Sequence, residues 1–120
     1  VVEEGKEVVG FVIAINEGSS DESLNYKFFN SHFSKFTYID RIVIAEKARG
    51  KGIGRKLYAY ISEKMESNIL CCEVNIKPPN PKSLSFHEKV GFVEMSKLIT
   101  EGGEKVVSLL VRRNDAREKL

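Results

Sequence analysis

A glycine-rich turn at residues 49–54 carries the residues best placed to do chemistry. Alternate positions of the turn have no side chain, because they are Gly50, Gly52 and Gly54, so backbone N–H groups can approach a ligand closely. The turn opens a predicted helix, whose first N–H groups lack partners and carry a partial positive charge. Full positive charges come from the basic residues Arg49, Lys51, Arg55 and Lys56. Together these features predict a cradle for a diphosphate.

The spacing of the glycines separates this turn from two common phosphate motifs. A dinucleotide-binding turn has G-x-G-x-x-G, whereas this turn has G-x-G-x-G and is one residue short. A nucleoside-triphosphate loop needs G-x-x-x-x-G-K-[ST], which the sequence lacks. Spacing alone leaves open a plainer alternative, a tight turn in a basic surface loop.

Strands and helices alternate around the turn. Apolar residues at helical spacing predict the helix after it, and Asn80, Pro81 and Gly91 are typical start and stop residues of a second helix. The aromatic-rich segment 24–36 fits a short helix, an irregular flap or a packed loop. The predicted elements are a hairpin over 1–15, strands over 37–45 and 69–76, helices over 54–67 and 81–90, and a hairpin over 92–111.

Length and composition bound the class of protein. The 120 residues fit one compact domain, and 42% apolar with 30% charged residues is ordinary for a globular protein. Cys71 and Cys72 lie in an apolar run, which predicts two buried thiols, no disulfide and a cytoplasmic location. No apolar run reaches the roughly 20 residues of a membrane span, and no metal site is predicted.

Two motifs resemble those of the GNAT superfamily of acetyl-CoA-dependent N-acetyltransferases. Arg49-x-x-Gly52-x-Gly54, between a strand and a helix, is similar to the acetyl-CoA motif of that family. The segment 80–92, which begins with Asn80 and ends with Gly-Phe, resembles the later helix of the family. Both motifs stand in the family's order, and the resemblance extends from the first hairpin onward.

The resemblance implies an α/β (α+β) fold with a mixed β-sheet that splays near its middle and is flanked by helices. Acetyl-CoA would lie between the strand ending near Ile44 and the strand 69–76. Strand backbone would hold the pantetheine arm, the turn would bind the pyrophosphate, and the start of the later helix would contact the cofactor arm or serve only as a cap. The implied cofactor-binding residues are Ile42, Val43, Ile44, Arg49, Gly50, Lys51, Gly52, Ile53, Gly54, Arg55, Asn80 and Ser83.

His87 marks a departure from the family. Relatives often carry a Tyr at this position as the acid that protonates the leaving thiolate. An imidazole titrates near neutral pH, so His87 could donate that proton, or it could simply pack against its helix's neighbours.

Two carboxylates are candidates for the base that deprotonates the acceptor amine. By the period of two, Asp40 shares a strand face with Tyr38, Ile42 and Ile44, and it points toward the cleft if they do. Glu73 lies on the adjoining strand. Each carboxylate could instead be solvated or ion-paired.

The resulting hypothesis is an enzyme that transfers acetyl from acetyl-CoA to a primary amine of a small molecule or protein, by direct attack on the thioester. The alternatives are a non-catalytic acyl-CoA-binding module and a nucleic-acid-binding module, and the nearly balanced net charge of +2 disfavours the second. Residues 1–111 would form the domain, without the strand and helices that open the family fold, and 112–120 a charged tail. The final hairpin could pair across a homodimer.

Overall fold

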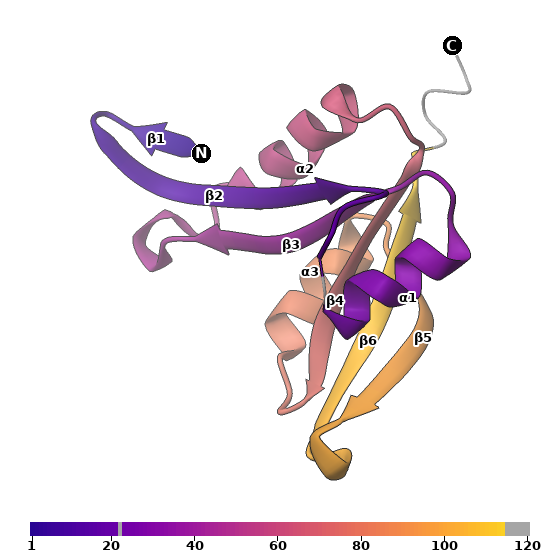
Figure 1. The fold of residues 1–120 in the computed structure, drawn as a ribbon. Helices are drawn as coiled ribbons and strands as arrows, with labels where there is room; N and C mark the ends of the chain where they lie inside the picture. The colour runs from indigo at the N-terminus through magenta and orange to yellow at the C-terminus, as the bar shows by residue number, and fades with distance from the viewer. Residues whose placement is uncertain (22, 115–120) are drawn as a thin grey trace.

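The computed structural model describes residues 1–21 and 23–114, and within them six strands form one sheet (Figure 1). The strand order is β1-β2-β3-β4-β6-β5. The strands are β1 (Val2–Glu4), β2 (Glu7–Asn16), β3 (Thr37–Ile44), β4 (Ile69–Lys77), β5 (Val93–Thr100) and β6 (Lys105–Arg113). The helices are α1 (Leu24–His32), α2 (Ile53–Lys64) and α3 (Pro81–Lys89), with single 3₁₀ turns at Glu46–Ala48 and Glu101–Gly103.

Both predicted hairpins are confirmed. β1 pairs antiparallel with β2, and β5 pairs antiparallel with β6. The last strand continues to Arg113, two residues into the segment predicted as a charged tail. Residues 115–120 of that segment lie outside the described residues. No helix in the described part of the chain is long and apolar enough to cross a membrane.

The sheet splays between its two central strands, as the family resemblance implied. β3 and β4 run parallel but pair only at Thr37↔Leu70 and Tyr38↔Cys71. Beyond these pairs β3 continues to Ile44, and β4 continues to Lys77. Figure 1 shows the strands β1–β3 diverging from β4, β6 and β5 like the arms of a V.

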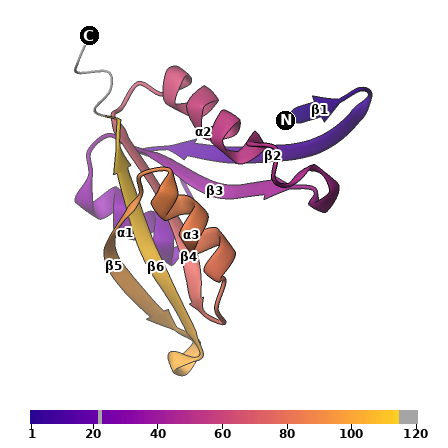
Figure 2. The same cartoon turned by 180° about the vertical axis from the view of Figure 1, so that it is seen from behind.

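Helices cover both faces of the sheet (Figure 2). α2 and α3 pack on one face, where Tyr58 and Phe86 meet the strands, and α1 packs on the other. The segment 24–36 is therefore a short helix with a connecting loop, which resolves the alternatives left by its sequence. Ser23 caps α1 by accepting a hydrogen bond from the Tyr26 N–H, and Tyr26 and Phe29 are fully buried.

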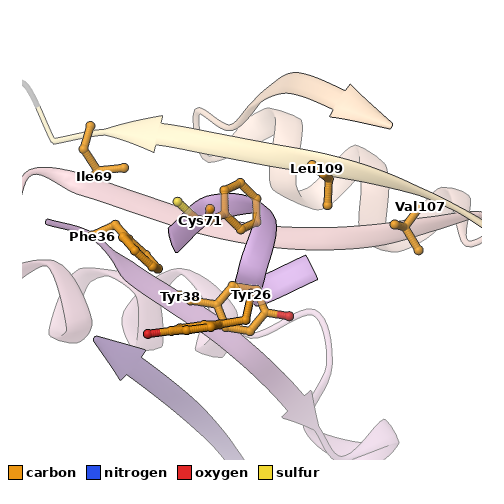
Figure 3. Close-up of a cluster of buried hydrophobic side chains, with 8 residues drawn as sticks. Tyr26, Phe36, Tyr38, Ile69, Cys71, Val107 and Leu109 are labelled. Carbon is orange, nitrogen blue, oxygen red and sulfur yellow. The ribbon is translucent and has the colours of Figure 1, made fainter. Parts of the chain in front are cut away.

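An aromatic cluster joins α1 to the sheet. Figure 3 shows its side chains gathered between the helix and the strands, from Tyr26 on α1 and Tyr38 on β3 to Leu109 on β6. Cys71 belongs to this cluster and Cys72 to the core on the opposite face. Both thiols are free and buried, as predicted. Burial raises the pKa of Cys71 to about 12.

A β-bulge at Asp40 breaks the predicted alternation of β3. Ile13 on β2 pairs with Arg41 and the next residue, Ala14, pairs with Ile39, so Asp40 is the extra residue. Tyr38 consequently packs in the cluster under α1, whereas Ile42 packs on the α2 side. The prediction that one strand face carries Tyr38, Asp40, Ile42 and Ile44 was wrong, because a bulge shifts the period of two.

Candidate active site

The divergence of β3 from β4 leaves part of the β3 edge without a strand partner. Because pairing ends at Tyr38, the edge of β3 that faces β4 has no strand partner over residues 39–44, within the part of the chain described. Backbone N–H and C=O groups on such an edge need partners, and a bound ligand can supply them. Ile42, Val43 and Ile44, which the resemblance assigned to the pantetheine arm, lie on this edge.

The glycine turn leaves the N-terminus of α2 uncovered. Gly50 has φ 80° and Gly52 has φ 77°, and a Cβ on either residue would meet nothing within 4 Å. Their requirement is therefore conformational, because other residues rarely adopt this left-handed region. Gly52 is the N-cap of α2 and makes no side-chain cap bond. The first N–H groups of the helix are left for a ligand, as in other anion sites.

Gly54 also has a packing role, which the sequence did not predict. A Cβ at this position would lie 2.7 Å from Cζ of Phe86 on α3, which is closer than real Cβ contacts come. Gly54 therefore lets α3 pack directly against the first turn of α2. Helix packing thus accounts for the missing side chain at this position, and a contact between the Gly54 backbone and a ligand stays a prediction.

The basic side chains of the turn already contact the N-terminal hairpin. Lys47 pairs with Glu7, and Lys51 Nζ lies 3.3 Å from Glu4 Oε2. All four side chains are exposed, and pairs of this kind contribute little free energy, so a phosphate can compete for the lysines. Arg49 Nε donates to the Ile44 carbonyl oxygen at 3.1 Å, which ties the turn to the end of β3.

The N-terminus of α3 lies beyond the end of β4. Asn80 caps the helix, since its Oδ1 accepts from the Ser83 N–H at 3.3 Å. Asn80 is therefore a helix cap, and its contact with the cofactor arm stays a prediction. Ser83 is half-buried, and its carbonyl oxygen accepts from His87 Nδ1 at 2.7 Å.

His87 is packed between the two helices of this face. Its side chain is only 4% exposed, and its Nε2 lies 2.6 Å from the Tyr58 hydroxyl. With Nδ1–H donating to Ser83, the neutral ring accepts the Tyr58 proton at Nε2. Burial lowers the pKa of His87, which keeps the ring neutral. The structure thus favours the packed alternative over a proton donor.

Both carboxylate candidates lie close enough to Tyr38 for their charges to raise its pKa. The Tyr38 hydroxyl donates to Glu73 Oε2 at 2.6 Å, two residues beyond the last β4 pair with β3. Glu73 is half-buried, and burial raises the pKa of its carboxyl, while the Tyr38 hydrogen bond lowers it. Asp40 is exposed, but its charge still raises the pKa of Glu73.

Sequence reasoning missed two polar groups at this point. It named Tyr38 only as a strand residue, and it assigned no role to Asn25, whose hydrogen bond also lowers the pKa of Glu73. A tyrosine in a predicted buried strand is the signal that could have drawn attention to Tyr38, because buried hydroxyls need a partner. Nothing in the spacing links Asn25 to a residue 48 positions away.

Comparisons with known proteins agree with this arrangement. The model of the Acetyltransferase (GNAT) family matches residues 1–92. Naa20 of Chaetomium thermophilum, solved with a bisubstrate analogue, has a TM-score of 0.75 at 17% identity over 99% of this chain and 68% of its own.

Two further solved structures share the fold. A chimera of the Vibrio cholerae spermidine N-acetyltransferase SpeG and hSSAT has a TM-score of 0.67 at 23% identity over 100% of this chain and 71% of its own. A chain of the NatC complex bound to Gag peptide and CoA has a TM-score of 0.64 at 18% identity, over 88% of this chain and 60% of its own. The chain thus spans about two thirds of the length of these proteins. No curated protein sequence matches it.

Proposed function

The chain belongs to the GNAT acetyltransferase family, and on that premise we propose that it transfers an acetyl group from acetyl-CoA to a primary amine. The observation that carries the proposal is the splay of β3 from β4 with the uncovered N-terminus of α2 at its mouth. An extended thioester with a diphosphate fits such a site, because bare strand edge and free helix N–H groups meet there.

Each part of acetyl-CoA has a candidate contact. The turn 49–55 and the first N–H groups of α2 would hold the pyrophosphate, with Ile53 contributing only backbone because its side chain is buried in the core. The free edge of β3 would hold the pantetheine arm and the thioester carbonyl. Asn80 and Ser83 would contact the arm from α3.

Glu73 is the base that this structure supports best. The attacking amine must be neutral, so a carboxylate takes its proton. The amine nitrogen then bonds to the thioester carbon, the C–S bond breaks, and the second proton of the nitrogen passes to the departing CoA thiolate. A thiol with a pKa of about 8.5 leaves readily, so a strong acid is not needed. Glu73 is half-buried and anchored, whereas Asp40 is exposed, and we therefore rank Glu73 first.

Calorimetric titration with acetyl-CoA tests the binding site. Gly52→Asp places a carboxylate at the mouth of α2 and should abolish binding. Gly18→Asp is the matched control, since Gly18 has φ 78° and equally open surroundings in the loop after β2. Loss of binding in both variants, or in neither, would contradict the proposed site.

Release of free CoA with a panel of primary amines tests the reaction. Glu73→Gln should retain acetyl-CoA binding and lose turnover, while Asp40→Asn should keep most of it. The buried His87 favours a second candidate, a module that binds acyl-CoA without catalysis. Tight binding with no CoA release from any amine would support that candidate instead.

A further inference from the structure

We propose that Tyr38 is a positioning residue for Glu73, holding its carboxylate in place and in the anionic form at the point where the sheet opens. This inference rests on the proposed function and deepens it, because it explains how a half-buried carboxylate can begin the reaction without a proton. Tyr38 itself is not assigned a contact with either substrate.

The first observation is where the contact lies. Tyr38↔Cys71 is the last backbone pair between β3 and β4, and Glu73 follows two residues later on the same strand face as Cys71. The hydroxyl–carboxylate bond of 2.6 Å therefore bridges the two strands just beyond their last backbone pair. A hydrogen bond of this length to a carboxylate is charge-assisted and among the stronger kinds.

The second observation is that the Tyr38 ring is fixed. It is 1% exposed and meets the Tyr26 ring edge-on, with centroids 5.6 Å apart (Figure 3). Tyr26 is itself anchored, because its hydroxyl donates to the Asn16 carbonyl and accepts from the Ser19 N–H. With its ring held in this cluster, Tyr38 directs its hydroxyl to Glu73.

The third observation is the balance of groups around Glu73. Burial favours the neutral carboxyl, and the Asp40 charge on β3 acts in the same direction. Tyr38, Asn25 on α1 and Lys105 on β6 favour the anion, with Tyr38 the strongest of the three. Burial and the Glu73 charge also raise the pKa of Tyr38, so its hydroxyl stays protonated and keeps donating.

Carbon-13 NMR of protein labelled at the Glu side-chain carboxyl tests the proposal without any acceptor. Glu73→Gln identifies the Glu73 signal. Tyr38→Phe should move its titration midpoint to higher pH, and the matched control Tyr26→Phe, which removes a hydroxyl from the same cluster, should leave it in place. An unchanged or lowered midpoint in folded Tyr38→Phe would overturn the proposal.

A second measurement uses the wild-type protein in case Tyr38→Phe does not fold. With carbon-13 at the ring Cζ of Tyr, the Tyr38 signal should shift with the same midpoint as Glu73, and Glu73→Gln should abolish that shift. A Tyr38 signal that ignores the Glu73 titration would also overturn the proposal.

Kinetics separate this inference from the proposed function. With an amine that the panel identifies, Tyr38→Phe should lower kcat/KM roughly tenfold at pH values below the Glu73 titration midpoint. This is the loss expected when a charged group loses a hydrogen bond. The KM for acetyl-CoA should stay unchanged. If Glu73→Gln keeps full turnover, the base assignment fails. If Glu73→Gln is inactive but Tyr38→Phe shifts neither the midpoint nor the profile, only the positioning role fails.

Discussion

A methyl group at position 54 tests how closely α2 and α3 pack at the mouth of the site. A Cβ on Gly54 would lie 2.7 Å from Phe86 Cζ and 3.2 Å from Cε1, while ordinary contacts begin at 3.4 Å. The ring must therefore retreat by about 0.7 Å, the difference between the shortest contact and an ordinary one. Phe86 also packs near Tyr58, with ring centroids 6.0 Å apart, so it cannot move freely.

The expected magnitude is the difference of two effects. Overpacking a filled core costs about 1–3 kcal/mol. Replacing glycine by alanine within a helix returns at most about 1 kcal/mol, and less in the first turn. We expect Gly54→Ala to lose about 1–2 kcal/mol, which for a chain of this size lowers Tm by roughly 4–8 °C. Acetyl-CoA should also bind more weakly, because the N-terminus of α2 must shift.

A double-mutant cycle is the assay. Denaturant unfolding and calorimetry would be measured for wild type, Gly54→Ala, Phe86→Leu and the double variant. Leu in place of Phe86 makes room for the methyl group, so Gly54→Ala should cost nothing in that background, with a coupling of about 1–2 kcal/mol. A stable Gly54→Ala protein, or purely additive losses, would refute the close packing.

Three further results are expected. Burial lowers the pKa of His87, so below about pH 6.5 the unfolded chain binds a proton on this imidazole that the folded protein does not bind. Stability should therefore fall as the pH drops below about 6.5, and His87→Gln should reduce that fall in urea unfolding. Cys71 and Cys72 should resist Ellman's reagent in the native protein and react only after unfolding, since both are buried. Glu4→Gln with Glu7→Gln should raise acetyl-CoA affinity by up to about fivefold at low salt and not at high salt, because the loop lysines are freed.

Local chemistry accounts for the part of the fold that the sequence could predict. Turn residues marked both hairpins, and the Asn80-Pro81 start of α3 matches its observed cap. The splayed sheet was predicted only through the order of two motifs, because no single strand encodes where its pairing stops. The aromatic segment had no clean period, so its helix became evident only from Tyr26 and Phe29 packing against the sheet.

What the sequence did not reveal depends in each case on tertiary contacts. A bulge depends on the partner strand, so nothing in the run around Asp40 revealed the extra residue. Gly54 looked like its neighbours in the turn, but Phe86, 32 residues later, explains it. His87 occupies the position where the resemblance led us to expect an acid, but its partner Tyr58 lies on α2 and was not evident from the sequence. A motif identifies a position, whereas the packing around it decides what the side chain there can do.

The bulge in β3 links the fold to the choice of base. If β3 alternated regularly, Tyr38 would lie on the same face as Ile42, toward α2. Cys71 and Glu73 on β4 point to the opposite face. The extra residue at Asp40 turns Tyr38 to the α1 face instead, where it reaches Glu73. Asp40 itself is exposed at the strand surface. One added position thus gives one carboxylate a fixed, buried hydrogen-bond donor and leaves the other to solvent, which is the reason we propose Glu73 and not Asp40 as the base.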